Sequence, residues 1–183
     1  MIITDPSIED SKIEKKILQN ISKIIKTKNY ILGKNVKLFE REFSKFSGAK
    51  FTVGVNSGTD AIIISLLSQN IGNGDEVILP SHSASATAMA VKLVGAKPIF
   101  VDINEDNFLI DYNEINKKIT KKTKVIIAVH IYGQSCNMEK ITEIADKNNL
   151  IIIEDCAQAH GTFYKKKHVG NFGIMGCFSF YPT

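Results

Sequence analysis

Apolar residues near the start of the chain recur at helical spacing. Between Pro6 and Lys28 the intervals are four, four and three positions, at Ile13, Ile17, Ile21 and Ile24. Such a stripe is typical of an amphipathic helix. The spacing returns in a second segment, which Gly48 ends, at Val36, Phe39, Phe43 and Phe46. We therefore predict two helices in an N-terminal helical segment, residues 1–48.

From residue 49 onward, short β-branched runs alternate with longer helical segments. The runs with strand character are Phe51–Val55, Glu76–Leu79, Lys97–Val101, Lys124–Val129, Leu150–Ile153 and Cys177–Phe180. Helices are expected at Asp60–Gln69, Ala84–Val94, Asn113–Thr120 and Met138–Asn148. Several runs are apolar throughout, as is typical of strands covered on both faces. The prediction for residues 49–183 is an α/β fold, a mainly parallel sheet with helices on both faces.

Composition narrows the class of protein. The 183 residues, 44% of them hydrophobic, suffice for one sizeable core. The formal net charge of +4 is largely dispersed, which disfavours a nucleic-acid-binding surface. The polar N-terminus and the lack of a long apolar run predict neither a signal peptide nor a membrane span. Three cysteines without a Cys-x-x-Cys pair disfavour a disulfide framework and a zinc site, so we expect a cytoplasmic protein.

Ligands of open α/β sheets collect beyond the carboxyl ends of the strands. The first predicted strand leads into Ser57, Gly58, Thr59 and Asp60, which open a helix. Free amides at a helix N-terminus attract an anion, and glycine lets a ligand approach the backbone closely. The same residue types also form ordinary helix caps, so this segment alone leaves both interpretations open.

A second strand end carries acidic residues. The apolar run Ile151–Ile153 leads directly into Glu154 and Asp155. A carboxylate at the end of a buried strand is costly unless it meets a cation, either a metal ion or a protonated ring nitrogen. Because the glycine-lysine pattern of a P-loop is missing, the nucleotide-hydrolase interpretation lacks its phosphate-binding half.

These sites, taken in order, resemble the DegT/DnrJ/EryC1/StrS family of sugar aminotransferases, pyridoxal-phosphate enzymes of fold type I. The matching stretches cover nearly the whole chain: residues 30–33, 39–40, 57–61, 74–80, 95–102, 130–134, 154–161 and 176–183. The last two read EDCAQAHG and GCFSFYPT. Each stretch is weak alone, but the ordered set is specific.

The resemblance implies roles at the matched positions. Gly58 and Thr59, with the amide of Asp60, would bind the phosphate of pyridoxal phosphate, and Ser179 would bind it from the far side. Asp155 would pair with the pyridine nitrogen and keep it protonated, so that the ring accepts electrons from the substrate carbon.

The ring itself has two further candidate contacts. Gln158 would hydrogen-bond the side of the ring that carries the 3-hydroxyl group. Many family members stack an aromatic residue on the ring a few positions after Pro80, but here Ala84 stands in that place. His82 is the candidate replacement, because an imidazole can lie flat on a pyridine ring; the alternative is that another side chain covers the ring.

In the family, the stretch that ends this sequence at Thr183 is followed at once by the lysine that binds the cofactor covalently. We therefore identify no catalytic residue in the chain, expect the chain alone to be inactive, and expect the smaller C-terminal domain to be absent. A histidine in place of that lysine would imply a sugar dehydratase on the same scaffold. A non-catalytic fragment is the remaining alternative.

The activity implied by the resemblance is transfer of an amino group, with glutamate as the expected donor, to a nucleotide-linked keto-deoxy sugar. Family products enter polysaccharides, glycans or antibiotics. The resemblance also implies a cytoplasmic homodimer with active sites at the subunit interface, and no nucleic acid, metal or membrane among its partners.

Overall fold

The computed structural model describes residues 10–181. One parallel sheet has the strand order β2-β1-β3-β4-β7. Its strands are β1 (Glu76–Pro80), β2 (Lys97–Val101), β3 (Thr123–Val129), β4 (Ile151–Asp155) and β7 (Met175–Cys177). A separate antiparallel hairpin joins β5 (Phe163–Tyr164) to β6 (Lys167–His168). The predicted parallel sheet is confirmed.

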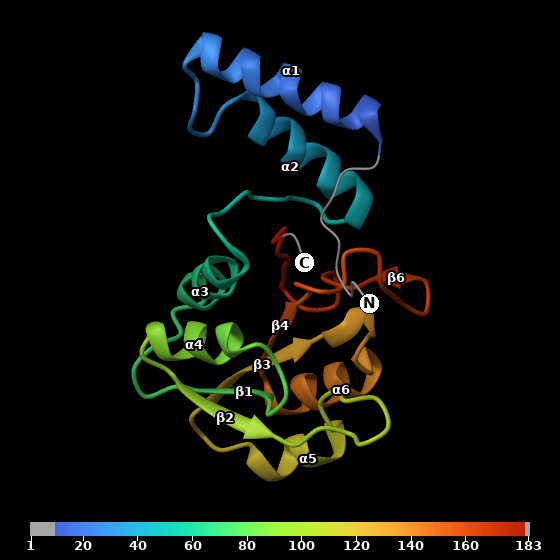
Figure 1. The fold of residues 1–183 in the computed structure, drawn as a ribbon. Helices are drawn as coiled ribbons and strands as arrows, with labels where there is room; N and C mark the ends of the chain where they lie inside the picture. Colours follow the sequence, from blue (N-terminus) through green and yellow to red (C-terminus); the bar gives the residue numbers. More distant parts are fainter. Residues whose placement is uncertain (1–9, 182–183) are drawn as a thin grey trace.

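Helices cover both faces of this sheet, as predicted (Figure 1). α3 (Gly58–Ser68) and α4 (Ser85–Leu93) lie on one face, and α5 (Tyr112–Lys118) and α6 (Met138–Asn148) lie on the other. A single 3₁₀ turn, η1 (Ile131–Gly133), follows β3. Because every strand pair of the five-stranded sheet is parallel, the carboxyl ends of β3, β4 and β7 meet at one edge, where Asp155 lies beside Val129 and Cys177.

The core lies around the central strands. All of β1 is buried, as is all of β3 except Lys124, because helices cover both faces. Burying an aliphatic side chain such as Ile78 or Ile126 stabilises the fold by about 1.5–3 kcal/mol. β2 lies at the sheet edge, and its Phe100 remains 48% exposed.

Two N-terminal helices precede the sheet, as predicted: α1 (Ser11–Thr27) and α2 (Lys34–Ser47). The Asp10 side chain caps α1 by accepting a hydrogen bond from the Lys12 amide, and the part of the predicted helix before Asp10 lies outside the described residues. α1 buries none of its residues. No helix among residues 10–181 is long and apolar enough to cross a membrane.

The predicted strand at Phe51–Val55 is wrong. This segment runs without sheet pairing in the described chain, and Phe51 and Val53 are 77% and 73% exposed. The Gly54 amide donates to a carboxylate oxygen of Glu40 at 2.8 Å rather than to a neighbouring strand. Alternating apolar residues indicate an extended backbone, but a strand also needs a neighbour to receive its hydrogen bonds.

The last predicted strand, Cys177–Phe180, is displaced toward the N-terminus. β7 ends at Cys177, and the next residues leave the sheet and pack against α2. The ring of Phe43 lies 5.0 Å from Phe178 and 5.3 Å from Phe180, both edge to face. Aromatic packing of this kind stabilises the departure from the sheet, since such pairs contribute about 0.5–1.5 kcal/mol beyond area burial.

Candidate cofactor site

The N-terminus of α3 offers backbone amides that have no acceptor among residues 10–181. Ser57 is the N-cap, and its Oγ accepts a hydrogen bond from the Asp60 amide at 3.0 Å. The predicted phosphate donor at Asp60 is therefore occupied by the cap. The amides of Gly58 and Thr59 belong to the first helical turn, where no acceptor within the helix exists. These two amides are therefore the donors that could receive an anion.

Ser179 lies directly against Gly58, although the two residues are far apart in the sequence. A Cβ atom placed on Gly58 would lie 2.8 Å from the Cβ of Ser179, closer than carbon atoms pack. Glycine at position 58 is what allows the Ser179 hydroxyl to approach the helix N-terminus. The structure thus brings together two predicted phosphate-binding residues, Gly58 from the start of α3 and Ser179 from the segment after β7.

Asp155 ends β4 and is only 6% exposed. Its Oδ2 accepts a hydrogen bond from the Thr87 hydroxyl at 2.7 Å, and its Oδ1 accepts one from the Ala157 amide at 3.1 Å. Burial raises the pKa of the Asp155 carboxyl above its ordinary value, while these two bonds oppose the rise. None of the ion pairs among the described residues includes Asp155. A cation beside this carboxylate would lower its pKa and gain a strong interaction.

Thr87 was missed by sequence reasoning. It occupies α4 between Ala86 and Ala88 and has the appearance of an ordinary helical residue. The available signal was a threonine hydroxyl between two alanines, in a helix that packs against the sheet.

His82 and Gln158 are linked through Tyr132. His82 Nε2 lies 2.9 Å from the Tyr132 hydroxyl oxygen, and the Tyr132 amide donates to Gln158 Oε1 at 2.7 Å. Tyr132 has a left-handed backbone, with φ of 58°, which is uncommon for an aromatic residue. Because the Gln158 carbonyl is engaged, its NH₂ group is the end available to a ligand oxygen. Tyr132 was not predicted as a site residue.

A buried network lies behind the site. His130 Nε2 lies 3.0 Å from Glu154 Oε2, and the Cys136 amide donates to His130 Nδ1 at 3.1 Å. Nδ1 therefore carries no proton, so the ring is neutral and donates its Nε2 hydrogen to Glu154. Burial acts to raise the pKa of Glu154, but hydrogen bonds from His130 and from the backbone amides of Gly173 and Gly170 hold it below its ordinary value.

His130, Glu154 and Cys156 place ligand-type atoms within 4.8 Å of one another, an arrangement that resembles a metal site. The hydrogen-bonding pattern assigns these atoms to other partners, because both His130 ring nitrogens and both Glu154 oxygens are engaged. Burial also raises the pKa of the Cys156 thiol well above its ordinary value, which disfavours the thiolate that a metal needs.

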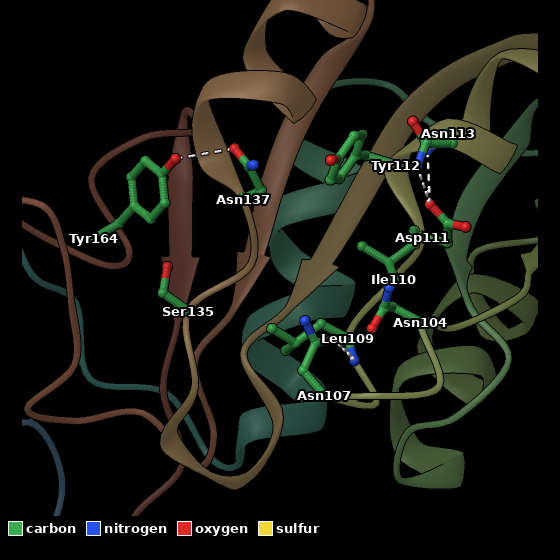
Figure 2. A pocket seen from close by; sticks show the side chains of 10 residues that line it. All are labelled: Asn104, Asn107, Leu109, Ile110, Asp111, Tyr112, Asn113, Ser135, Asn137 and Tyr164. Carbon is green, nitrogen blue, oxygen red and sulfur yellow. Dashed lines mark hydrogen bonds between the residues drawn. The ribbon is translucent and has the colours of Figure 1, made fainter.

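A polar pocket of about 290 Å³ lies apart from these residues, between the segments 104–113 and 135–137 (Figure 2). Its asparagines serve local structure: Asn104 and Asn107 accept hydrogen bonds from nearby backbone amides, and Asn137 caps α6 and accepts a bond from Tyr164. None of the predicted site residues lines it. The candidate site therefore lies at the strand ends rather than in this pocket.

The fold and the strand ends define an α/β protein in which the N-terminus of α3 has free amides at Gly58 and Thr59 among the described residues, and the buried carboxylate of Asp155 ends β4. More specifically, the chain belongs to the DegT/DnrJ/EryC1/StrS aminotransferase family, whose model matches residues 11–183.

Similar proteins include sugar transaminases and solved aminotransferase structures. A dTDP-3-amino-3,6-dideoxy-alpha-D-galactopyranose transaminase of Aneurinibacillus thermoaerophilus is 46% identical over 92% of this chain and 47% of its own length. The structure of S. venezuelae DesV in complex with a ketimine intermediate has a TM-score of 0.92 at 36% identity, covering 98% of this chain and 48% of that one. NtdA from Bacillus subtilis, solved with bound cofactor PMP, has a TM-score of 0.82 at 38% identity, covering 84% and 35%. The chain spans about half the length of the curated relatives that it matches.

Proposed function

We propose that this chain forms the cofactor-binding half of a pyridoxal-phosphate-dependent aminotransferase that acts on a nucleotide-linked keto sugar. The observation that carries the proposal is a buried carboxylate, without an ion-pair partner among residues 10–181, close to a helix N-terminus with free amides. Asp155 lies beside Cys177 in the β4–β7 register, and Ser179 follows two residues later against Gly58. The cofactor has one cationic ring nitrogen and one phosphate, so the site offers a partner for each.

The residues present fit this cofactor, and each has a definable task. The Gly58 and Thr59 amides and the Ser179 hydroxyl bind the phosphate, while Asp155 holds a proton on the ring nitrogen. The Gln158 NH₂ group donates to the ring's oxygen substituent. Bound in this way, the cofactor supplies an electron sink for a substrate carbon that loses its proton.

The face of the ring has a candidate cover in His82. The His82 imidazole is hydrogen-bonded to the Tyr132 hydroxyl. Its ring centre lies 6.0 Å from that of Phe108, and we place the imidazole at the rim of the site. We propose that this His82–Tyr132 pair takes the place of the stacking aromatic residue that Ala84 replaces.

The substrate and assembly proposals rest on the relatives and on one exposed surface. Relatives are named as transaminases of dTDP- and UDP-linked sugars, which supports a nucleotide-linked keto sugar as acceptor. Glutamate is the amino donor that we propose. The exposed apolar face of α1, which includes Ile13, Ile17 and Ile21, supports a homodimer. A cytoplasmic location and a division into a helical segment, residues 1–48, and a cofactor-binding unit, residues 49–183, complete the proposal.

Binding of pyridoxamine phosphate tests the cofactor site, because this form of the cofactor needs no covalent link to the protein. We expect saturable binding by the purified protein and at least about tenfold weaker binding in Asp155→Ala, which lacks the charged partner. Asp146→Ala, which removes an exposed carboxylate of α6, is the matched control and should bind like the wild type. Equal affinities of wild type and Asp155→Ala would contradict the proposal.

The substrate class is tested separately on the full-length protein. Nitrogen from ¹⁵N-labelled glutamate should appear in a nucleotide-linked keto sugar, detected by mass spectrometry. Equally fast labelling of the same keto sugar without its nucleotide would rule out the proposed acceptor class.

A further inference from the structure

Thr87 makes an unusual contact for a helical threonine. In a helix, a threonine hydroxyl commonly bonds the backbone carbonyl three or four residues earlier. The Thr87 hydroxyl instead reaches Asp155 Oδ2 at 2.7 Å, across 68 positions of sequence. Thr87 is 1% exposed, so this bond is shielded from water. Threonine is only a modest helix former, so helix propensity does not account for its presence at position 87.

The direction of the hydrogen bonds follows from the acceptor. An ionised carboxylate only accepts, so the single hydroxyl hydrogen of Thr87 is donated to Asp155. The Ser83 hydroxyl lies 2.9 Å from Thr87 Oγ1 and therefore donates its own hydrogen to Thr87. The chain Ser83 to Thr87 to Asp155 has a single polarity, which favours the charged form of the carboxylate over the neutral form.

The two oxygens of Asp155 are held by different elements. Oδ1 accepts from the Ala157 amide, just beyond β4, whereas Oδ2 accepts from a side chain on α4. Two fixed donors from separate elements set the orientation of the carboxylate plane. With these contacts, the carboxylate is oriented before any ligand arrives.

We propose that Thr87 is a positioning residue that orients Asp155 and keeps it ionised for the ring nitrogen of the cofactor, with Ser83 orienting Thr87 in turn. This inference rests on the proposed function. Thr87 acts through Asp155 and touches neither substrate nor cofactor.

Thr87→Val tests the proposal, because valine keeps the shape of threonine and removes only the hydroxyl. The readouts are the affinity for pyridoxamine phosphate between pH 4 and 8 and the ionisation midpoint of Asp155, followed by ¹³C NMR of its carboxyl carbon in the cofactor-free protein. We expect about tenfold weaker binding at neutral pH, as for the loss of one hydrogen bond to a charged group. The ionisation midpoint of Asp155 and the midpoint of the pH dependence of pyridoxamine phosphate affinity should both move to higher pH. A purely structural role for Thr87 would not move either one.

Two further variants complete the series. Thr87→Ser retains the hydroxyl and should restore the wild-type midpoint. Ser83→Ala leaves the buried Thr87 in place and should shift the midpoint in the same direction by a smaller amount. If Thr87→Val does not fold, the Ser83→Ala midpoint decides the matter, and a midpoint equal to that of the wild type overturns the proposal.

The failure of this inference differs from the failure of the proposed function. Wild-type protein that binds pyridoxamine phosphate, together with unshifted midpoints in Thr87→Val, overturns the positioning role alone. Wild-type protein that binds none at any pH removes the cofactor site and the positioning role with it.

Discussion

His130 donates its Nε2 hydrogen to Glu154 across 3.0 Å, and both side chains are wholly buried. The remaining acceptor capacity of Glu154 is taken by the backbone amides of Gly170, Phe172 and Gly173, at 2.7–2.8 Å. One carboxylate therefore joins β4 to the loop that leads into β7. Because the histidine is neutral and only Glu154 is charged, the stability of the network depends on complete hydrogen bonding of the carboxylate rather than on charge pairing.

Glu154→Gln should lower the free energy of unfolding by about 3 kcal/mol or more, because the glutamine NH₂ group would face N–H donors in a buried site. Urea denaturation at pH 7 measures the change. Glu143→Gln, which breaks an exposed pair with Lys140, is the control and should cost less than about 1 kcal/mol. A loss for Glu154→Gln no larger than the control would mean that the network relaxes around the amide.

The same variant has a defined pH dependence. Because the folded pKa of Glu154 lies below the unfolded value, its contribution is complete above the unfolded pKa and is lost as the pH falls through the folded one. The stability difference between wild type and Glu154→Gln should therefore shrink in acid. Urea titrations between pH 7 and pH 3 would reveal it.

Asp155→Asn should show the opposite dependence. The folded pKa of Asp155 is raised, so the wild type loses stability as the pH rises from the unfolded pKa through the folded one. Asparagine does not ionise, so the cofactor-free variant should gain stability relative to the wild type from pH 4 to pH 7 while losing affinity for pyridoxamine phosphate. A stability difference that stays constant with pH would show that Asp155 is not strained by burial.

Gly58→Ala should destabilise the protein by about 1–3 kcal/mol, the usual cost of overpacking, and weaken pyridoxamine phosphate binding. The clash is with the Ser179 Cβ, so adding Ser179→Gly should recover stability without recovering binding. Gly72→Ala, where an added Cβ would meet only Val94 O at 3.4 Å, is the control. If the double variant were as unstable as Gly58→Ala, the predicted contact would not be the cause.

The thiols should be inert in the native protein. Cys136, Cys156 and Cys177 are free and buried, and burial raises the pKa of Cys136 and Cys177 to about 12 and that of Cys156 well above its ordinary value. An aromatic disulfide reagent at pH 8 should label none of them until urea unfolds the chain, and then all three. Rapid labelling of one thiol in native protein would reveal local opening there.

The sheet was predictable because buried parallel strands have a distinctive apolar composition, and β1, β3 and β4 show it. The error at Phe51–Val55 has a physical cause: alternation is a local property, whereas strand pairing depends on a neighbour elsewhere in the chain. The end of β7 was misplaced for a related reason. Phe178 and Phe180 have high strand propensity, but the rings of α2 compete for them.

The site was predictable where local chemistry is distinctive. The glycine at a helix start pointed to Gly58, and the strand end pointed to both Glu154 and Asp155; the resemblance then selected Asp155 and added Ser179. Thr87 was not predictable, because its importance arises where α4 crosses the end of β4. Tyr132 was missed because its amide and hydroxyl act through Gln158 and His82, contacts that spacing in sequence does not reveal.

The aromatic packing of α2 on the residues after β7 has a consequence for the order of folding. During synthesis, α2 emerges from the ribosome long before Phe178 and Phe180 do, so until then its phenylalanines have only one another to pack against. Contacts between such distant positions form slowly, and the waiting apolar surface is exposed to aggregation. Nascent chains halted before β7 should therefore be the species most in need of chaperone protection.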